Sequence, residues 1–104
     1  MTMEQDKKLT GAELIAIERQ RQKEVEGYSV EDDLKNNLSD DLVWAAEAYL
    51  RSSIDTSDKK AADLWPWGKE TFKPKDAVRD LARAGALIAA AIDVILAKSN
   101  MSHD

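Results

Sequence analysis

The residues of this sequence that could do chemistry are carboxylates. The chain has no cysteine, and its one histidine, His103, is next to the last residue. A metal site would therefore be built from acidic side chains, whose oxygens suit hard cations such as Mg²⁺. The acidic candidates are spread along the chain: Glu18, Asp32, Asp33, Asp40, Asp41, Glu47, Asp80 and Asp93.

Several of these carboxylates also have a purely structural interpretation. Asp40 and Glu47 are seven residues apart, so they share a helix face and could converge on a cation. Asp40 and Asp41 could instead only stabilise a helix start, where the helix dipole favours negative charge. Asp93 interrupts an apolar run, and a carboxylate buried there needs a partner. We predict an ion pair between Asp93 and Arg21 of the first helix, with exposure of Asp93 to solvent as the alternative.

A second stretch with chemical potential is residues 64–75. It contains both prolines, two of the three tryptophans and the only phenylalanine. Trp65 and Trp67, followed by Lys69 and Lys73, could stack a base and neutralise phosphates, which predicts a nucleotide-binding loop. The alternative is that the tryptophans close one end of a helical bundle. The sequence has no Gly-rich phosphate loop and no Ser/His/Asp set.

The elements that must position these residues are helices, because the apolar residues recur at helical spacing. Thr10 and Glu13 form a capping-box pattern that opens a helix to about Glu26, with Gly27 placed to end it. A short turn is expected at residues 29–37, a second helix at 39–52, and a third at 75–98, with Pro74 suited to its first turn. Residues 53–74 are a long connection. The predicted fold is an all-α bundle of three main helices with a Trp-Pro-Trp loop.

The last predicted helix organises the chain. From residue 84 to residue 97 its only polar residue is Asp93, so we expect it to be covered on most of its circumference. Fourteen residues span about 21 Å, short of a hydrocarbon core of roughly 30 Å, so it is not a membrane span. Small residues on it, such as Ala84, Gly85, Ala89 and Ala91, allow close helix approach, which predicts a homodimer through this helix.

Length and charge restrict the function classes. A chain of 104 residues is one domain, which we place at residues 10–98 between flexible tails at 1–9 and 99–104. A net charge of -5 argues against binding to nucleic-acid backbones or anionic membranes. The first nine residues contain no apolar signal-peptide core, so we expect a cytoplasmic protein.

The order of these pieces resembles a group of small phage- and prophage-encoded proteins. The resemblance is carried by Glu18-Arg-Gln-Arg-Gln, Asp41-Leu-Val-Trp, Trp65-Pro-Trp, Phe72-Lys-Pro and Asp80-Leu-Ala-Arg-Ala-Gly-Ala-Leu-Ile. More remotely, the layout is similar to the MazG-like all-α nucleoside triphosphate pyrophosphohydrolases. Those enzymes bind Mg²⁺ through acidic residues on two helices and work as dimers or tetramers. The sequence departs from their metal motifs. The family has another acid four residues after its paired glutamates, whereas Trp44 and Ala45 lie four residues after Asp40 and Asp41. The second motif has two acids three residues apart, whereas Asp80 is followed at that distance by Arg83.

This resemblance implies a Mg²⁺ site made by Glu18, Asp33, Asp41 and Glu47, and a nucleotide as ligand. The predicted function is a MazG-like accessory protein that binds or acts on nucleotides, with a degenerate Mg²⁺-dependent pyrophosphohydrolase as its enzymatic form. The alternative is a non-enzymatic interaction module that binds and modulates a host or phage protein. A clustered acidic pocket would favour the first, and dispersed carboxylates with an exposed apolar patch would favour the second.

Overall fold

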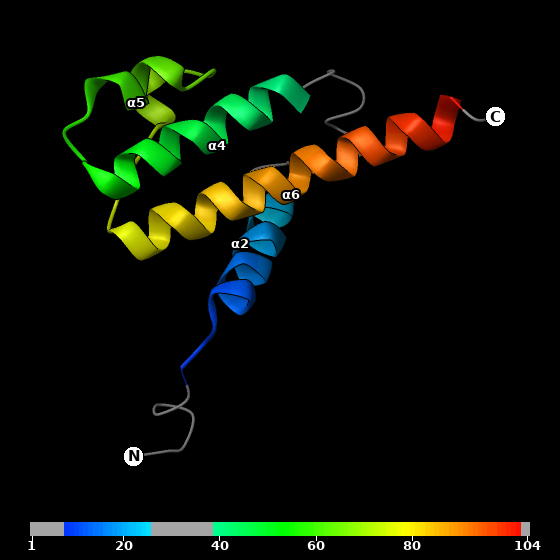
Figure 1. Ribbon diagram of the computed structural model, residues 1–104, viewed down its shortest axis with the longest axis horizontal. Helices are drawn as coiled ribbons and strands as arrows, with labels where there is room; N and C mark the ends of the chain where they lie inside the picture. The colour runs from blue at the N-terminus through cyan, green and yellow to red at the C-terminus, as the bar shows by residue number, and fades with distance from the viewer. Residues whose placement is uncertain (1–7, 26–38, 103–104) are drawn as a thin grey trace.

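The computed structural model describes residues 8–25 and 39–102, which contain helices and no strand (Figure 1). The helices are α2 (Gly11–Val25), α4 (Ser39–Ile54), α5 (Lys59–Leu64) and α6 (Ala77–Ser102), with one 3-10 turn, η1 (Lys69–Thr71). The all-α prediction is confirmed for this part of the chain. No helix within these residues is long and apolar enough to cross a membrane.

Helix α2 begins at the predicted capping box. The Thr10 N–H donates to Glu13 Oε1 at 2.8 Å, and the Glu13 N–H donates to Thr10 Oγ1 at 3.1 Å. These two bonds satisfy backbone donors that the first turn of a helix leaves unpaired. The predicted end of this helix at Glu26 and Gly27 and the turn at residues 29–37 lie outside the described residues.

Helix α6 lies between α2 and α4 and contacts both, running antiparallel to α4 (Figure 1). Asp76 caps its start by accepting the Arg79 N–H at 2.9 Å. Asp80, which is fully buried, accepts the Lys75 N–H and the Ser52 O–H, each at 2.8 Å. The bond from Ser52 ties the first turn of α6 to α4, and the bond from Lys75 ties it to the segment that precedes α6. Because α6 begins at Ala77, Pro74 precedes the helix and is not in its first turn.

The core lies between α4 and α6. Its buried apolar residues are Leu42, Ala45, Ala46, Ala48, Tyr49, Trp65, Ala84, Leu87, Ala90, Ala91 and Val94. Gly85 of α6 does not belong to this core but is the point where α2 approaches closely, because a Cβ atom there would lie 2.5 Å from Cδ1 of Ile15. Several of the small residues that suggested contact between subunits therefore pack within the chain.

The predicted long connection is more structured than expected, since it contains α5 and η1. Asp58 caps α5 by accepting the Lys60 N–H at 2.8 Å, and α5 packs on α4. After α5, Trp65 packs its ring against those of Tyr49 and Phe72, with centroids 5.3 and 5.2 Å away. Aromatic contacts and a capped helix thus hold this segment against the core.

The surface of α6 differs from the prediction. The helix was expected to be covered on most sides, yet Leu81, Ile88, Ile92 and Ile95 are each 42–54% exposed. They lie on one side of α6, whereas α4 and α2 cover other sides. The expectation is therefore wrong for a single copy of the chain.

Candidate ligand-binding cavity

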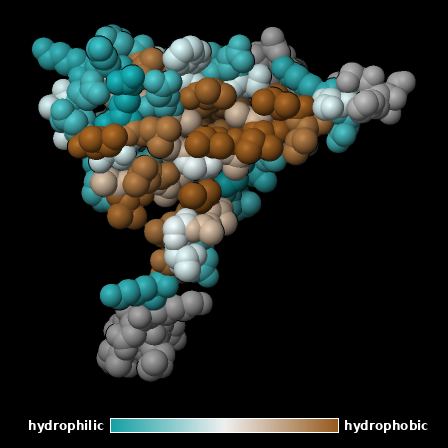
Figure 2. Space-filling view, viewed as in Figure 1, coloured by the Kyte–Doolittle hydropathy of each residue, from teal (hydrophilic) through white to brown (hydrophobic). Residues whose placement is uncertain are grey.

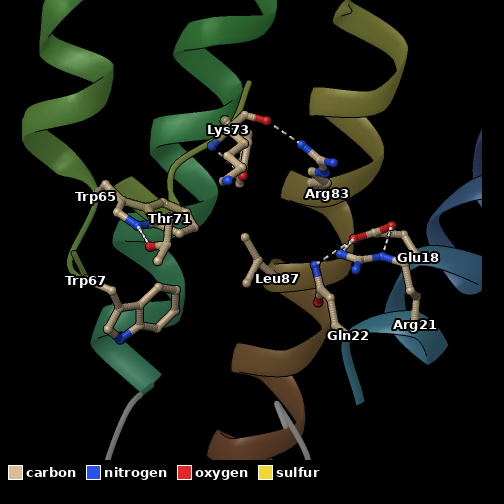
Figure 3. Close-up of a pocket in the computed structure, with 10 residues that line it drawn as sticks. Glu18, Arg21, Gln22, Trp65, Trp67, Thr71, Lys73, Arg83 and Leu87 are labelled. Atoms are coloured by element: carbon tan, nitrogen blue, oxygen red, sulfur yellow. Dashed lines mark hydrogen bonds and ion pairs between the residues drawn. The ribbon is translucent and has the colours of Figure 1, made fainter. Parts of the chain in front are cut away.

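A cavity of about 420 Å³ lies where α2, α4, α6 and the segment after α5 meet (Figure 3). Its volume is within the range of about 300–1,000 Å³ that small-molecule sites occupy. The residues that line it are Glu18, Arg21, Gln22, Tyr49, Trp65, Trp67, Thr71, Lys73, Arg83 and Leu87. Figure 3 shows α2 on one side, the two tryptophans and Thr71 on the other, and Leu87 between them.

The tryptophans form an aromatic wall in which the two rings have different roles. Trp65 is 8% exposed, and its indole N–H donates to Thr71 Oγ1 at 2.8 Å. The Thr71 hydroxyl in turn donates to the Gly68 carbonyl at 2.6 Å. Trp67 lies edge-on to Trp65, with ring centroids 5.1 Å apart, and is only partly buried. Trp65 therefore holds the wall in place, and Trp67 is the ring that a ligand can reach.

The opposite side of the cavity is basic. Arg83 donates from Nη1 to the Lys73 carbonyl at 2.6 Å, and its guanidinium lies 5.4 Å from the centre of the Tyr49 ring. Arg21 binds both carboxylate oxygens of Glu18, at 3.0 and 2.6 Å. The described part of the lining thus carries three cations, Arg21, Lys73 and Arg83, against one carboxylate, an excess of two positive charges. In a chain of net charge -5, such a local excess favours an anionic ligand.

Gln22 contributes a buried hydrogen-bond acceptor, its side-chain oxygen Oε1, to the cavity lining. Its side chain is 2% exposed, and its Nε2 donates to Glu18 Oε2 at 3.4 Å. This bond fixes the amide orientation, because the reversed amide would place its oxygen against the carboxylate. Oε1 then has no hydrogen-bond partner within the described structure. A buried acceptor without a partner costs about 1–3 kcal/mol, so a ligand N–H or O–H would be stabilised there.

A second hollow of about 600 Å³ adjoins the cavity between α2 and the start of α6. The two share Glu18, Arg21 and Arg83, and the second adds Arg79 and Asp76 to its lining. The shared residues place the two spaces side by side, so an extended ligand that reached past them would contact both. Three arginines line the second hollow, which suits the anionic end of such a ligand.

The predicted nucleotide-binding set is brought together in part. Trp65, Trp67 and Lys73 line the cavity, but Lys69 does not. Lys69 begins η1, and its 69% exposed side chain points to solvent, where Nζ lies 3.3 Å from Asp63 Oδ1. The sequence prediction missed Arg21, Gln22 and Arg83 as lining residues. The available signal was spacing, because Arg21 and Gln22 follow Glu18 by three and four residues and Leu87 follows Arg83 by four.

The predicted metal ligands are not gathered by the described part of the chain. Glu18 lines the cavity but pairs with Arg21, and Glu47 on α4 pairs with Arg51 at 3.4 Å. Asp41 is a half-buried residue in the first turn of α4, and Asp33 lies outside the described residues. Among residues 8–25 and 39–102, no three metal-ligating side chains come together. The Mg²⁺ site therefore stays a prediction.

The predicted partner of Asp93 is wrong. Asp93 lies 3.5 Å from Arg19 Nη2, whereas Arg21 pairs with Glu18. The reason is helical phase, because residues 19 and 21 are about 200° apart around α2. Arg19 follows Ile15 by one helical turn on the side that faces α6, whereas Arg21 turns toward the cavity. Arg19 is nearly buried, while the Asp93 side chain is 43% exposed, so the pair lies at the edge of the α2–α6 contact.

Comparison of the chain with protein-family models, curated proteins and solved structures gives no match. The features of the described structure that bear on function are the cavity and the exposed apolar surface. The cavity combines a reachable indole ring, a local excess of positive charge and a buried acceptor. These features select a ligand that has a planar ring, an N–H or O–H donor and an anionic group.

Proposed function

We propose that this protein binds a nucleotide in the cavity between α2, α6 and the Trp65–Trp67 wall. The observation that carries the proposal is the combination of Trp67, Gln22 and three cations around one space of about 420 Å³. A nucleotide has a planar base, donor groups on its base and sugar, and phosphates. Each of the three ligand parts therefore has a matching protein group.

The geometry supports one arrangement of the ligand. The base stacks on or beside Trp67, and one of its N–H groups or a ribose hydroxyl donates to Gln22 Oε1. The phosphates then extend toward Arg21 and Arg83, with Arg79 in the adjoining hollow. Stacking on an aromatic ring contributes about 1–3 kcal/mol per base, and charge-assisted hydrogen bonds to phosphate are of similar strength.

Binding is a better-supported proposal than hydrolysis. Metal-dependent pyrophosphate release needs carboxylates that converge on a cation beside the phosphates. Among the residues that the structure describes, Glu18 is the only carboxylate that lines the main cavity, and it is paired with Arg21. The proposed activity is therefore binding without hydrolysis, with Mg²⁺ as the counter-ion of the nucleotide phosphates. The resemblance to MazG-like enzymes favours a nucleotide over other ring-bearing anions.

The interaction-module alternative keeps one observation in its favour, namely the dispersed carboxylates together with an exposed apolar surface on α4 and α6. That surface lies on the other side of α6 from the cavity. The two functions are compatible, and their tests are separate.

The test is isothermal titration calorimetry of the full chain with a panel of NTPs, dNTPs, NMPs and inorganic pyrophosphate, with and without Mg²⁺. Lys73→Gln should weaken nucleotide binding by about 5- to 10-fold, and Trp67→Leu by about 10-fold or more. Lys59→Gln, which makes the same charge change on exposed α5, is the matched control and should bind like the wild type. No binding at millimolar nucleotide, or equal losses for both lysine variants, would refute the proposal.

Pyrophosphate release from the same panel separates binding from catalysis. The proposal expects no turnover. Metal-dependent turnover that is lost in an Asp41→Asn, Glu47→Gln double variant would overturn the binding-only proposal and would establish the predicted metal ligands instead.

A further inference from the structure

One continuous face of the α4–α6 pair is apolar and uncovered. On α4 it comprises Val43, Leu50 and Ile54, and on α6 it comprises Leu81, Ile88, Ile92 and Ile95. We call these seven residues the aliphatic face. Their exposed fractions run from 40% to 89%. Figure 2 shows this apolar surface as a brown band along both helices on the side turned toward the viewer.

We propose that the aliphatic face binds a second copy of this chain. The first argument is spacing. The intervals are seven and four residues on α4, and seven, four and three residues on α6. These intervals fit the a and d positions of a heptad, which face a partner helix that runs nearly parallel or antiparallel. The position skipped by each seven-residue interval is Glu47 on α4 and Gly85 on α6. The face is thus built to receive helices.

The second argument is chemical composition. The aliphatic face is apolar except at Glu47, which follows Val43 by four residues and precedes Leu50 by three on the same side of α4. Ala84 and Ala91 lie buried at its base on α6. The Glu47 carboxylate pairs with Arg51 of the same helix at 3.4 Å, so its charge is balanced within α4. A partner that offered charges would leave them desolvated and unpaired. A second copy offers the same aliphatic residues, and a two-fold axis through the face would match them with one another.

The third argument is area. A fully exposed aliphatic side chain presents about 100 Å² of apolar surface, so seven that average about half exposed present roughly 400 Å². A stable interface buries about 800 Å² per partner, of which roughly 500 Å² is apolar. The aliphatic face therefore supplies most of the apolar surface that a stable dimer needs. Two paired faces would give a four-helix arrangement from α4 and α6 of both copies.

The face and the cavity do not compete for the same side of α6. Successive residues of an α-helix are about 100° apart, which places Arg83 and Leu87 roughly 100° or more from Ile88 around the axis. Arg83 and Leu87 line the cavity, whereas Ile88 belongs to the aliphatic face. Dimer formation would therefore leave both cavities open, and this proposal does not depend on the nucleotide proposal.

Sedimentation velocity of the full chain, between roughly 1 and 100 µM, tests the proposal. The wild-type protein should have a sedimentation-derived mass of twice the 11.6 kDa of one chain. Ile92→Glu and Leu50→Glu should each raise the dimer dissociation constant by about 100-fold or more, because the charge is buried at both symmetry-related positions. Val25→Glu makes the same change at a more exposed aliphatic residue, 69% exposed, which lies on α2 outside the face, and this variant should remain dimeric.

Circular dichroism distinguishes dissociation from unfolding, since the monomeric variants should keep the helical spectrum of the wild type. Cross-linking gives an independent readout, because the chain has no cysteine of its own. Ile92→Cys should form a disulfide-linked dimer on oxidation, whereas Lys59→Cys should not. A wild-type monomer at the highest concentration would overturn the proposal. So would a dimer that survives both glutamate substitutions, or an assembly larger than a dimer.

Discussion

Asp80 offers the sharpest test of how the fold is held together. Its carboxylate is fully buried, and it accepts the Ser52 O–H and the Lys75 N–H, each at 2.8 Å. Removing the carboxylate by Asp80→Ala breaks both bonds, of which the one from Ser52 connects the start of α6 to α4 and the one from Lys75 holds the segment that precedes α6. Hydrogen bonds to a charged group contribute about 1.5–3 kcal/mol each, so the two together contribute about 4 kcal/mol.

Part of this loss is recovered in the variant. The Ser52 hydroxyl also lies 3.1 Å from the Tyr49 carbonyl, to which it can donate when Asp80 is removed. That bond offsets about 1 kcal/mol. Asp80→Ala should therefore lower the free energy of unfolding by about 3 kcal/mol, which corresponds to a fall in Tm of roughly 15 °C for a domain of this size.

Asp80→Asn is the matched control. The amide keeps one oxygen to accept the Lys75 N–H, and its NH₂ group can donate to Ser52 Oγ while the serine hydroxyl bonds Tyr49. The expected loss is only about 1 kcal/mol, because neutral hydrogen bonds replace charge-assisted ones. Urea and thermal unfolding, followed by circular dichroism at one fixed protein concentration, measures both variants. A loss below about 1 kcal/mol for Asp80→Ala, or equal losses for the two variants, would refute this account of the α4–α6 junction.

Two further predictions concern single polar groups. Gln22→Leu removes a buried acceptor without a partner and should raise the free energy of unfolding by about 1 kcal/mol, while nucleotide affinity in calorimetry falls by about 5-fold. Unchanged affinity would show that Oε1 does not contact the ligand. The Ser57 hydroxyl and backbone N–H donate to Asp55 and lower the pKa of its carboxyl. Ser57→Ala should raise that pKa toward its ordinary value of 3.8, which an NMR titration of the Asp55 carboxyl measures, and an unchanged pKa would contradict the role of the hydroxyl.

Much of the helical framework could be predicted because its signals are local. The Thr10–Glu13 capping box, the cap at Asp76 and the apolar periodicity lie within a few residues of one another. Helix α5 was missed because it has six residues and depends on the Asp58 cap and on packing against α4. Contacts of that kind join distant parts of the chain and leave no periodic pattern in a short segment.

The site was predictable only where the sequence clusters its residues. Trp65, Trp67 and Lys73 fall within one short stretch, and the cavity contains all three. The other wall comes from α2 and α6, and its α2 residues precede Trp65 by more than forty residues in the sequence. The position of this wall therefore depends on how α6 crosses α2. The error over Asp93 has the same origin. Its partner is Arg19 because Gly85 allows Ile15 to approach α6 closely, which sets the rotation of α2.

The nearly unbroken apolar sequence of α6 now has an explanation in terms of its different sides. One side, with Leu87 and Val94, is buried against α4, and a second, with Gly85 and Ala86, meets α2. A third carries Ile88 and Ile92, and within a single copy it has no cover comparable to the other two. Exposure of aliphatic side chains to water is unfavourable, and their burial against another helix is favourable. A row of them at heptad spacing along four turns therefore indicates a partner helix. The dimer proposal supplies that partner without closing the cavity, which leaves Arg83 and Trp67 at the cavity for a ligand.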